Sequence, residues 1–419
     1  MRLHNLSISF LSLRGITSNR SLATIYLVVM CIQIVAIEGY GISPLKVVLM
    51  GIAPFLFICK TMFVSPALVW SLLYWAWCYF SALFNGEMRF STIGYLGMFV
   101  ITYIVFYGLL YKEAFSFEYF KKLLRGLIIA FGVVLILQQI AILVGLRSFW
   151  FINLDNQFFL DIDKLPSLTL EPSHTARILT VAMLCYLRCI EIDNGGIRPT
   201  LFALFDKEHR LVIILFLWAM LTMGSGTAFV GLAILSLYFL QRKTLIYIIP
   251  VFALLFYISQ SIGLSQLDRA LRVAKAASTG NVEMVQEEDG SAASRVIPII
   301  NTLTIDLSQT ESWVGKGIQS KEYAANRWKQ TNKLLSVVEQ YGLVGLIIGL
   351  LLVYTCAIRT FISLETLLFL FLLGFSVGNI AYGWGCLMIF TCSRYFQEQY
   401  ENRLLTMDEN FNKKRYIIE

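Results

Sequence analysis

The stretch Ser167-Leu-Thr-Leu-Glu-Pro-Ser-His-Thr-Ala-Arg177 leads directly into an apolar run, Ile178 to Ile190. Pro172 lacks an amide hydrogen and suits the first turn of a helix, so Glu171 or Ser173 is the expected cap. Polar and charged groups at the mouth of a membrane segment are costly and usually functional. The stretch therefore predicts a site at the start of a membrane helix, and the rest of the chain is interpreted around it.

Three ionisable side chains meet in this motif. His174 and Arg177 are three residues apart and share a helical face, and the positive end of the helix would face Glu171. A carboxylate, an imidazole and a guanidinium are thus expected around one small volume. The alternative is a well-capped membrane helix with a snorkelling arginine.

The composition places the whole chain in a membrane. Of 419 residues, 57% are apolar and only 15% are charged, whereas soluble proteins carry about 25% charged residues. Apolar runs of spanning length recur without the alternation of a β-barrel, so we expect an all-α integral membrane protein with about 12 transmembrane helices. The runs lie at about 22–38, 46–63, 67–84, 92–111, 126–146, 173–190, 211–223, 228–240, 244–262 and 337–358, followed by two shorter apolar pieces around Gly378-Asn379.

Signals for processing and for metal binding are weak. Arg14 and Arg20 precede the first apolar run without a clear cleavage site, which indicates a retained span. The eight cysteines lie in or at the edges of apolar segments, and three histidines are too few for a histidine-based metal centre. We expect no metal, no cofactor and no nucleic-acid partner. The net charge of +7 matters less than its distribution.

The domain organisation follows from the spans and their charges. Residues 1–262 hold spans one to nine, 263–336 form a long loop with amphipathic helices, 337–392 hold spans ten to twelve and 393–419 form a charged tail. Lysine and arginine crowd one set of loops, and the short loops on the other side carry few. By the positive-inside rule both termini are cytoplasmic. The few outside residues are Lys46, Arg89, Arg147 and Lys164.

This orientation places three polar features on one outer face: the Glu171 motif, the turn Gly224-Ser-Gly-Thr227 and the long loop. In that loop, residues 264–277 have the period of an amphipathic helix, and a second helix is expected from Ser294 to Leu307. Arg295 would lie in its first turn, against the helix dipole, and therefore needs another reason to be there, such as an anionic ligand.

Cations on this face could hold a pyrophosphate. Arg177 and Arg295 are the first candidates, since arginine binds phosphate bidentately. Arg269, Arg272, Lys316 and Arg327 are further candidates, for which solvated loop charges are the alternative. The Gly224 turn could offer amides to an anion or be a plain hairpin, and Trp313-Val-Gly-Lys-Gly317 indicates a close backbone approach or a loop reversal. The full set of candidate substrate contacts is Ser225, Thr227, Lys316, Arg327, Asn332 and Glu339.

Together these residues resemble a known family. Leu-Glu-Pro-Ser-His-Thr-Ala-Arg at an outer helix start, Gly-Ser-Gly-Thr one hairpin later, and Ser-Arg…Trp-Val-Gly-Lys-Gly…Asn…Glu-Gln-Tyr-Gly-Leu-Val-Gly are similar to the bacterial O-antigen and capsule polymerases. The O-antigen ligases share that layout. The likeness covers about residues 165 to 350, and the first five spans match only as generic membrane helices.

The resemblance implies a C-type membrane glycosyltransferase fold and an enzyme of lipopolysaccharide or capsule biosynthesis. Such a polymerase joins undecaprenyl-diphosphate-linked oligosaccharide repeat units on the periplasmic face of the bacterial inner membrane. Donor and acceptor are both lipid-linked, and a chain-length-determining membrane protein is an implied partner. The ligases have a His-Asn pair where this chain has Thr331-Asn332, which weakens the ligase alternative.

A mechanism follows from the chemistry. The anomeric carbon already bears a good leaving group, so the enzyme must stabilise the departing diphosphate and deprotonate an acceptor hydroxyl. We assign Arg177 and Arg295 to the diphosphate and either Glu171 or His174 to the hydroxyl, with direct displacement and inversion expected.

Two other classes remain as alternatives. A lipid-linked oligosaccharide flippase or transporter would carry charges within its spans and internal repeats, whereas mid-span charges are scarce here, with Glu365 the plain exception, and no repeat is seen. A structural membrane scaffold would leave the outer-face cluster unexplained.

Overall fold

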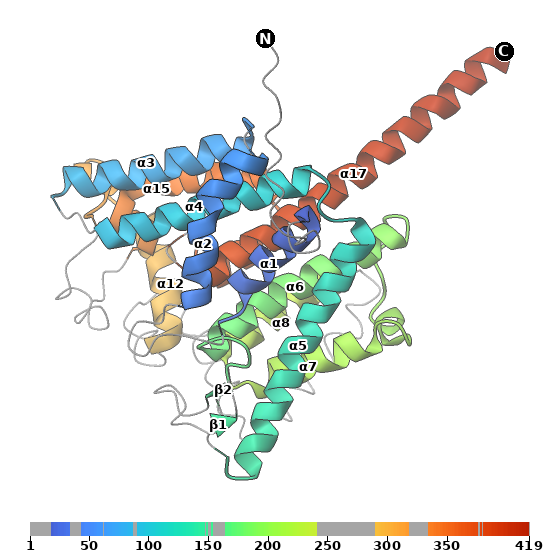
Figure 1. The fold of residues 1–419 in the computed structure, drawn as a ribbon, viewed down its shortest axis with the longest axis horizontal. Helices are drawn as coiled ribbons and strands as arrows, with labels where there is room; N and C mark the ends of the chain where they lie inside the picture. Colours follow the sequence, from blue (N-terminus) through green and yellow to red (C-terminus); the bar gives the residue numbers. More distant parts are fainter. Residues whose placement is uncertain are drawn as a thin grey trace, which may run out of the picture.

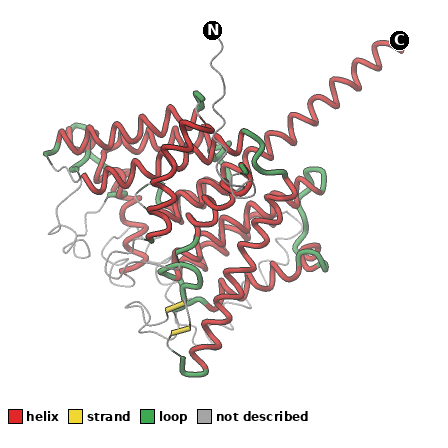
Figure 2. The backbone as a smooth tube through the Cα atoms, in the orientation of Figure 1, coloured by secondary structure: helices red, strands yellow, loops and turns green. Residues whose placement is uncertain are grey.

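The computed structural model describes residues 18–33, 43–61, 63–86, 90–146, 148–149, 152–153, 164–240, 290–317, 334–375, 378 and 380–418. These residues are helical apart from short connections and two-residue strands (Figures 1 and 2). The helices are α1 Asn19–Cys31, α2 Pro44–Leu56, α3 Pro66–Phe84, α4 Phe90–Tyr111, α5 Phe117–Leu143, α6 Pro172–Asp193, α7 Arg210–Thr222, α8 Gly226–Ser236, α12 Gly290–Leu303, α13 Thr310–Val314, α15 Ser336–Cys356, α16 Leu364–Leu373 and α17 Ala381–Ile418. Strands β1 Ser148–Phe149 and β2 Ile152–Asn153 pair antiparallel.

The helical membrane architecture is confirmed, and the number of spans is not. Within the described residues, five helices are long and apolar enough to cross a bilayer: α2 with the π turn that follows it, α3, α4, α5 and α15. The apolar helices α1, α7, α8 and α16 are shorter. The expected ninth span, 244–262, and the amphipathic segment 264–277 lie outside the described residues.

Helix α4 is the centre of the bundle. It is buried along most of its length, whereas α2 and α3 are largely exposed at the periphery. Its aromatic side chains pack against α17, where Trp384 lies parallel to Phe99 with ring centroids 6.2 Å apart. The hydroxyls of Tyr103 and Thr391 are 2.8 Å apart, so the contact is polar as well as apolar. These contacts fix the start of α17, which reaches the candidate site.

Three predicted boundaries are wrong. Helix α5 begins at Phe117 with Ser116 as its cap, about nine residues before its predicted start at 126, so Lys121, Lys122 and Arg125 lie in the helix. Helix α12 begins at Gly290, so Arg295 lies in its second turn and the dipole argument for this residue fails. Helix α17 runs without interruption to Ile418, so the charged tail 393–419 continues the last apolar helix (Figure 1).

The two ends of the bundle are defined by which helix termini meet there. At one end, named here the Glu171 end, the segment before α6 bonds to the ends of α1 and α7: Gln33 N–H donates to Leu168 O at 2.7 Å and Leu165 N–H to Met223 O at 3.3 Å. At the other, the Arg188 end, Lys121 near the start of α5 contacts Asp193 at the end of α6. Among the described cations that the positive-inside rule assigns to the cytoplasm, Lys121, Arg188 and Arg198 lie at the Arg188 end, where they contact Asp193 and Glu191.

Helices α6 and α8 run parallel and in close contact. A Cβ at Gly231 would lie only 2.3 Å from Thr180 Oγ1, so only glycine permits this approach. Further along, the hydroxyl of Tyr238, in the 3-10 turn that directly follows α8, donates to Glu191 Oε2 of α6 at 3.1 Å. The start of α8 therefore lies beside the start of α6, at the Glu171 end.

Candidate functional site

The segment before α6 is clamped to α5. Ser167 and Gln138 form a reciprocal pair: Ser167 N–H donates to Gln138 Oε1 at 2.9 Å, and Gln138 Nε2 donates to Ser167 O at 3.0 Å. The Ser167 hydroxyl donates to Phe131 O at 2.6 Å, which compensates for its left-handed backbone at φ 54°. These buried bonds fix where α6 begins.

Glu171 is the N-cap of α6, as predicted, but its side chain does not cap the helix. Its backbone is extended and its carbonyl accepts from the Thr169 hydroxyl at 2.8 Å. The carboxylate lies apart from the amides of the first turn. Its Oε2 accepts from Ser173 Oγ at 3.1 Å and lies 3.5 Å from His174 Nε2. Because the Glu171 side chain is 42% exposed, it remains accessible to a substrate.

The predicted meeting of Glu171, His174 and Arg177 is accompanied by a fourth group, Tyr382 in the first turn of α17. The rings of His174 and Tyr382 lie 4.2 Å apart between centroids, and Arg177 Nη1 donates to the Tyr382 hydroxyl. The Arg177 guanidinium carbon lies 5.2 Å from the centre of the same ring, a cation–π distance. Tyr382 thus orients both the imidazole and the guanidinium.

Arg177 still has unused hydrogen-bonding capacity. Its Nε is buried and has no hydrogen-bond partner, and the same is true of Thr227 Oγ1 on α8. Because α6 and α8 are parallel and Gly231 contacts Thr180, Thr227 lies about one helical turn nearer the Glu171 end, at the level of Arg177. Buried polar atoms without partners are rare in proteins, so this place is suited to a polar ligand.

Sequence reasoning missed Lys46, which it treated as an outside loop charge. Lys46 lies in the first turn of α2 and is only 2% exposed. Its charge and that of Arg177 both act on the imidazole of His174. A sequence signal did exist: Lys46, Met50 and Ala53 follow a helical period, and these residues form the buried face of α2.

The turn between α7 and α8 is compatible with both predictions made for it, an anion site built from backbone amides and a plain hairpin connection. Gly224 has φ 69°, and Ser225 is the N-cap of α8 without a side-chain cap bond. Its carbonyl accepts from Ala228 N–H at 3.0 Å. The turn is therefore a hairpin connection whose first helical amides are also directed toward the Glu171 end.

The close approach predicted at Trp313–Gly317 is confirmed. A Cβ at Gly342, where α15 is broken by φ 70°, would lie 2.0 Å from Trp313 O. Lys316 N–H donates to Glu339 O at 2.8 Å, so these two candidates are neighbours through their backbones. Within the described residues, no hydrogen bond or ion pair joins them to Glu171, His174 or Arg177. Their role as substrate contacts stays a prediction.

The remaining candidates are not placed. Arg269, Arg272, Arg327 and Asn332 lie outside the described residues, as does the side chain of Arg295. The backbone of Arg295 belongs to α12, whose end is joined to α15 through the Thr302 hydroxyl, which accepts from Leu335 N–H at 3.0 Å. Whether Arg295 meets Arg177 therefore stays a prediction.

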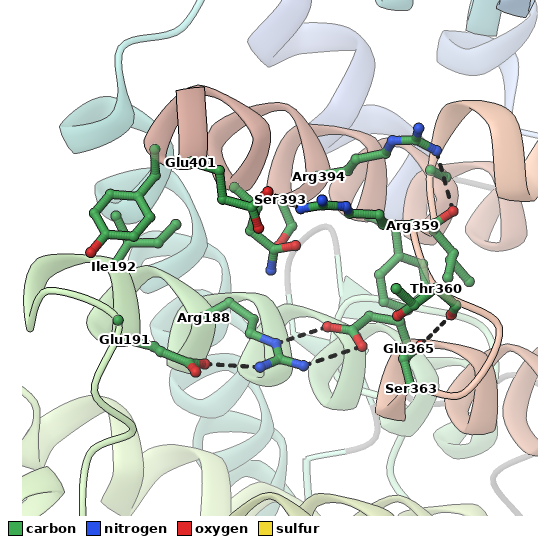
Figure 3. A pocket seen from close by; sticks show the side chains of 16 residues that line it. Arg188, Glu191, Ile192, Arg359, Thr360, Ser363, Glu365, Ser393, Arg394 and Glu401 are labelled. Carbon is green, nitrogen blue, oxygen red and sulfur yellow. Dashed lines mark hydrogen bonds and ion pairs between the residues drawn. The ribbon is translucent and has the colours of Figure 1, made fainter. Parts of the chain in front are cut away.

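A second polar region lies at the Arg188 end. A cavity of about 460 Å³ opens between α6, α17 and the segment that joins α15 to α16 (Figure 3). All three arginines that line it are in ion pairs. Arg188 contacts Glu191 at 2.8 Å and Glu365 at 2.9 Å, Arg359 pairs with Glu401, and Arg394 contacts Glu398 at 2.6 Å. The arginines of this cavity are therefore already neutralised by carboxylates of the protein. Because the Nε of Arg177 has no such partner, we take the Glu171 end as the candidate site.

A scan against protein-family models and searches of curated proteins and of solved structures gave no match to this chain.

Proposed function

We propose that this protein is a glycosyltransferase that joins polyprenyl-diphosphate-linked oligosaccharides into a polysaccharide, an O-antigen or capsule polymerase of the bacterial inner membrane with its site on the periplasmic face. One observation carries the proposal. An accessible carboxylate and an imidazole lie 3.5 Å apart, one turn from an arginine whose buried Nε has no partner. A base beside an anion-binding group is what a transfer from a lipid diphosphate requires.

In this mechanism Arg177 binds the diphosphate and stabilises the charge that develops as the bond to the anomeric carbon breaks. The positive end of the α6 helix dipole adds to the attraction for the diphosphate. Tyr382 fixes the guanidinium, so little reorganisation is needed during the reaction. Arg295 is the second proposed diphosphate ligand.

Either Glu171 or His174 removes the proton from the acceptor hydroxyl. Because the two groups are neighbours, one can take the proton while the other orients it or stabilises the resulting charge. The acceptor oxygen then attacks the anomeric carbon directly and the lipid diphosphate leaves, which inverts the configuration.

The one charge that fits the transporter alternative does not lie within a span. Glu365 lies in the first turn of α16 and pairs with Arg188 at 2.9 Å. It is a helix-end charge with a partner, and such charges do not require a transport pathway. The ligase alternative is weakened by Thr331-Asn332, which stand where the ligases have a His-Asn pair.

The proposal is tested with purified protein and a defined lipid-diphosphate repeat unit, with the products read as a ladder. Glu171→Gln keeps the size of the side chain and removes its charge, so we expect chain extension to fall by about 100-fold or more. Glu208→Gln, at an exposed carboxylate of the Arg188 end, is the matched control and should keep the ladder.

In cells, loss of Glu171 should leave expression and the display of single repeat units intact. A flippase defect would block display altogether, which separates the two classes. Long chains of normal length in the Glu171→Gln strain would remove Glu171 from the mechanism. His174→Gln, compared in the same assay, identifies which of the two groups is the base.

A further inference from the structure

The cavity at the Arg188 end is lined by two ion pairs that differ in exposure. The Arg188–Glu365 pair joins α6 to the start of α16, and its side chains are 16% and 13% exposed. The Arg359–Glu401 pair joins the segment after α15 to α17, and its side chains are 45% and 46% exposed. Figure 3 shows Glu401 on the opposite side of the cavity from Arg188 and Glu365. The cavity therefore has one buried pair and one pair that solvent reaches.

The exposed pair can be opened by a ligand. An ion pair that solvent reaches contributes little to stability, so its two charges can be separated at a small cost. The buried pair cannot be separated in this way, because each partner would be left desolvated without a counter-charge. Arg359 and Glu401 are therefore the charges of this cavity that a ligand can recruit.

The wall beside this pair is held by hydrogen bonds. Arg394 of α17 donates through Nη1 to Tyr354 O at 2.7 Å and to Ile358 O at 3.2 Å, which ties the end of α15 to α17. Ser363 is the N-cap of α16, and its hydroxyl accepts from the first turn of that helix. Among the residues that the structure describes, none forms a hydrogen bond with the amide of Gln397, which also lines the cavity. A fixed wall with an unused amide suits a polar ligand.

The charges that line the cavity are balanced. The lining contains as many arginines as glutamates: Arg188, Arg359, Arg394, Glu191, Glu365 and Glu401. A ligand with a single charge would take one member of the exposed pair and leave the other without a partner. A zwitterion gives both members a new partner, since its anionic group meets Arg359 and its cationic group meets Glu401. Because a guanidinium binds phosphate bidentately, the anionic group that fits best is a phosphate.

Apolar side chains surround the cavity and are not covered by the described part of the protein. Phe361 and Ile362 lie in the segment that joins α15 to α16, which also lines the cavity, and they are 66% and 96% exposed. Ile197 directly follows the lining residue Gly196 and is 73% exposed. In a membrane protein, such side chains at helix ends lie where the lipid headgroups meet the acyl chains. The cavity is therefore expected to open at the level of the headgroups.

We propose that this cavity binds the headgroup of a zwitterionic aminophospholipid, with the phosphate on Arg359 and the ammonium on Glu401. The volume of about 460 Å³ is in the range of small-molecule sites. Phe361 and Ile362 contact the acyl chains of the same lipid. The site is separate from the Glu171 end and does not depend on the proposed function.

The experiment uses the full-length protein in detergent. Phosphatidylethanolamine and phosphatidylglycerol with the same acyl chains are added together in equal amounts, and native mass spectrometry identifies the first lipid bound. We expect the zwitterionic ethanolamine lipid to be bound at least about fivefold more often than the anionic glycerol lipid. Glycerophosphoethanolamine, which has the same headgroup and no acyl chains, should not displace the lipid at equal concentration.

Substitutions at the exposed pair should change this preference in a specific way. Glu401→Gln removes the partner of the ammonium and keeps the partner of the phosphate, so the preference for the ethanolamine lipid should be lost. Arg359→Gln removes the partner of the phosphate and should weaken the binding of both lipids by about tenfold. Both variants should lower the melting temperature only slightly, because the pair is exposed. Glu208→Gln, at an exposed carboxylate of the same end outside the cavity, is the matched control and should keep the preference.

Four results would overturn the inference. Equal binding of the two lipids by the unmodified protein would show that the headgroup is not selected. An unchanged preference in Glu401→Gln would place the lipid site elsewhere. Displacement of the lipid by glycerophosphoethanolamine would assign the cavity to a soluble zwitterion. A Glu401→Gln protein that does not fold would give the pair a structural role.

Discussion

At the Glu171 end of α6, the buried Nε of Arg177 has no partner and Lys46 is buried without an ion pair to a described residue. At the Arg188 end of the same helix, one arginine contacts two carboxylates, at 2.8 and 2.9 Å. Both ends bring together charged side chains from several helices. The two ends differ because the arginine at the Arg188 end forms ion pairs with carboxylates, whereas the cations at the Glu171 end form none with described residues.

We infer from this difference that the paired charges around Arg188 stabilise the fold, whereas the unpaired charges at the Glu171 end bind a ligand. The desolvation cost of a partly buried cation with two carboxylate partners is offset within the protein, and the ion pairs of Arg188 join α6 to α16. The desolvation cost of a buried cation without such a partner is offset only when an anion binds. The comparison therefore predicts that changes at the Arg188 end lower stability, whereas changes at the Glu171 end lower binding and catalysis.

The largest effect on stability is expected from Glu365→Gln. The side chains of Glu365 and Arg188 are 13% and 16% exposed, so removing the charge of Glu365 leaves Arg188 desolvated with Glu191 as its remaining carboxylate partner among the described residues. We expect a loss of about 2–4 kcal/mol, measured by thermal or denaturant unfolding in detergent. Diphosphate affinity should not change.

A double variant sharpens this test. Arg188→Met combined with Glu365→Met removes both charges, so its loss should be smaller than the sum of the two single losses. If Glu365→Gln instead left stability unchanged and reduced diphosphate binding, the two ends of α6 would not differ in the way we infer.

An intermediate effect is expected from Tyr382→Phe at the Glu171 end. The ring that contacts His174 and Arg177 remains, but the hydroxyl that accepts from Arg177 Nη1 is lost. One lost hydrogen bond to a charged group corresponds to about 1.5–3 kcal/mol, or about tenfold to a hundredfold in diphosphate affinity and chain extension. Steady-state assays of the product ladder measure this loss. A melting temperature that falls sharply while activity per folded molecule is unchanged would make Tyr382 a packing residue.

The local parts of this architecture could be predicted from the sequence. The start of α6 is specified by Pro172 and the residues around it, because a proline at the first helical position and a cap before it act within a few residues. The close approach at Gly315 is likewise predictable from the sequence, since Gly315 and Gly317 follow Trp313 closely and such glycines mark backbone that tolerates no Cβ. Apolar length alone located the helices from α2 to α8 to within a few residues, apart from the start of α5.

The parts that depend on contacts between distant segments could not be predicted. Tyr382 lies more than 200 positions after Arg177, and only the packing of α17 on α6 brings them together. The period of α2 placed Lys46 on one face, but the sequence does not say that this face is the inward one. The end of α17 was also missed, since a charged helix that leaves the bundle has no apolar pattern to mark its continuation.

The smallest expected effect tests the periphery of the Arg188 end. Glu208 is 60% exposed and lies 3.1 Å from Lys121, and the hydrogen bond and charge of Lys121 lower the pKa of the Glu208 carboxyl below its ordinary value of 4.5. A carboxyl whose pKa is lowered by folding adds stability above its unfolded pKa, and this contribution is lost as the pH falls through the folded pKa. Because solvent screens the pair, Glu208→Gln should cost only a few tenths of a kcal/mol at pH 7 and less near pH 3. Melting temperatures of both proteins at the two pH values measure this. If the loss of stability caused by Glu208→Gln were as large at low pH as at pH 7, Glu208 would act through packing. The exposed Glu208–Lys121 pair would then not stabilise the protein electrostatically, unlike the ion pairs of Arg188.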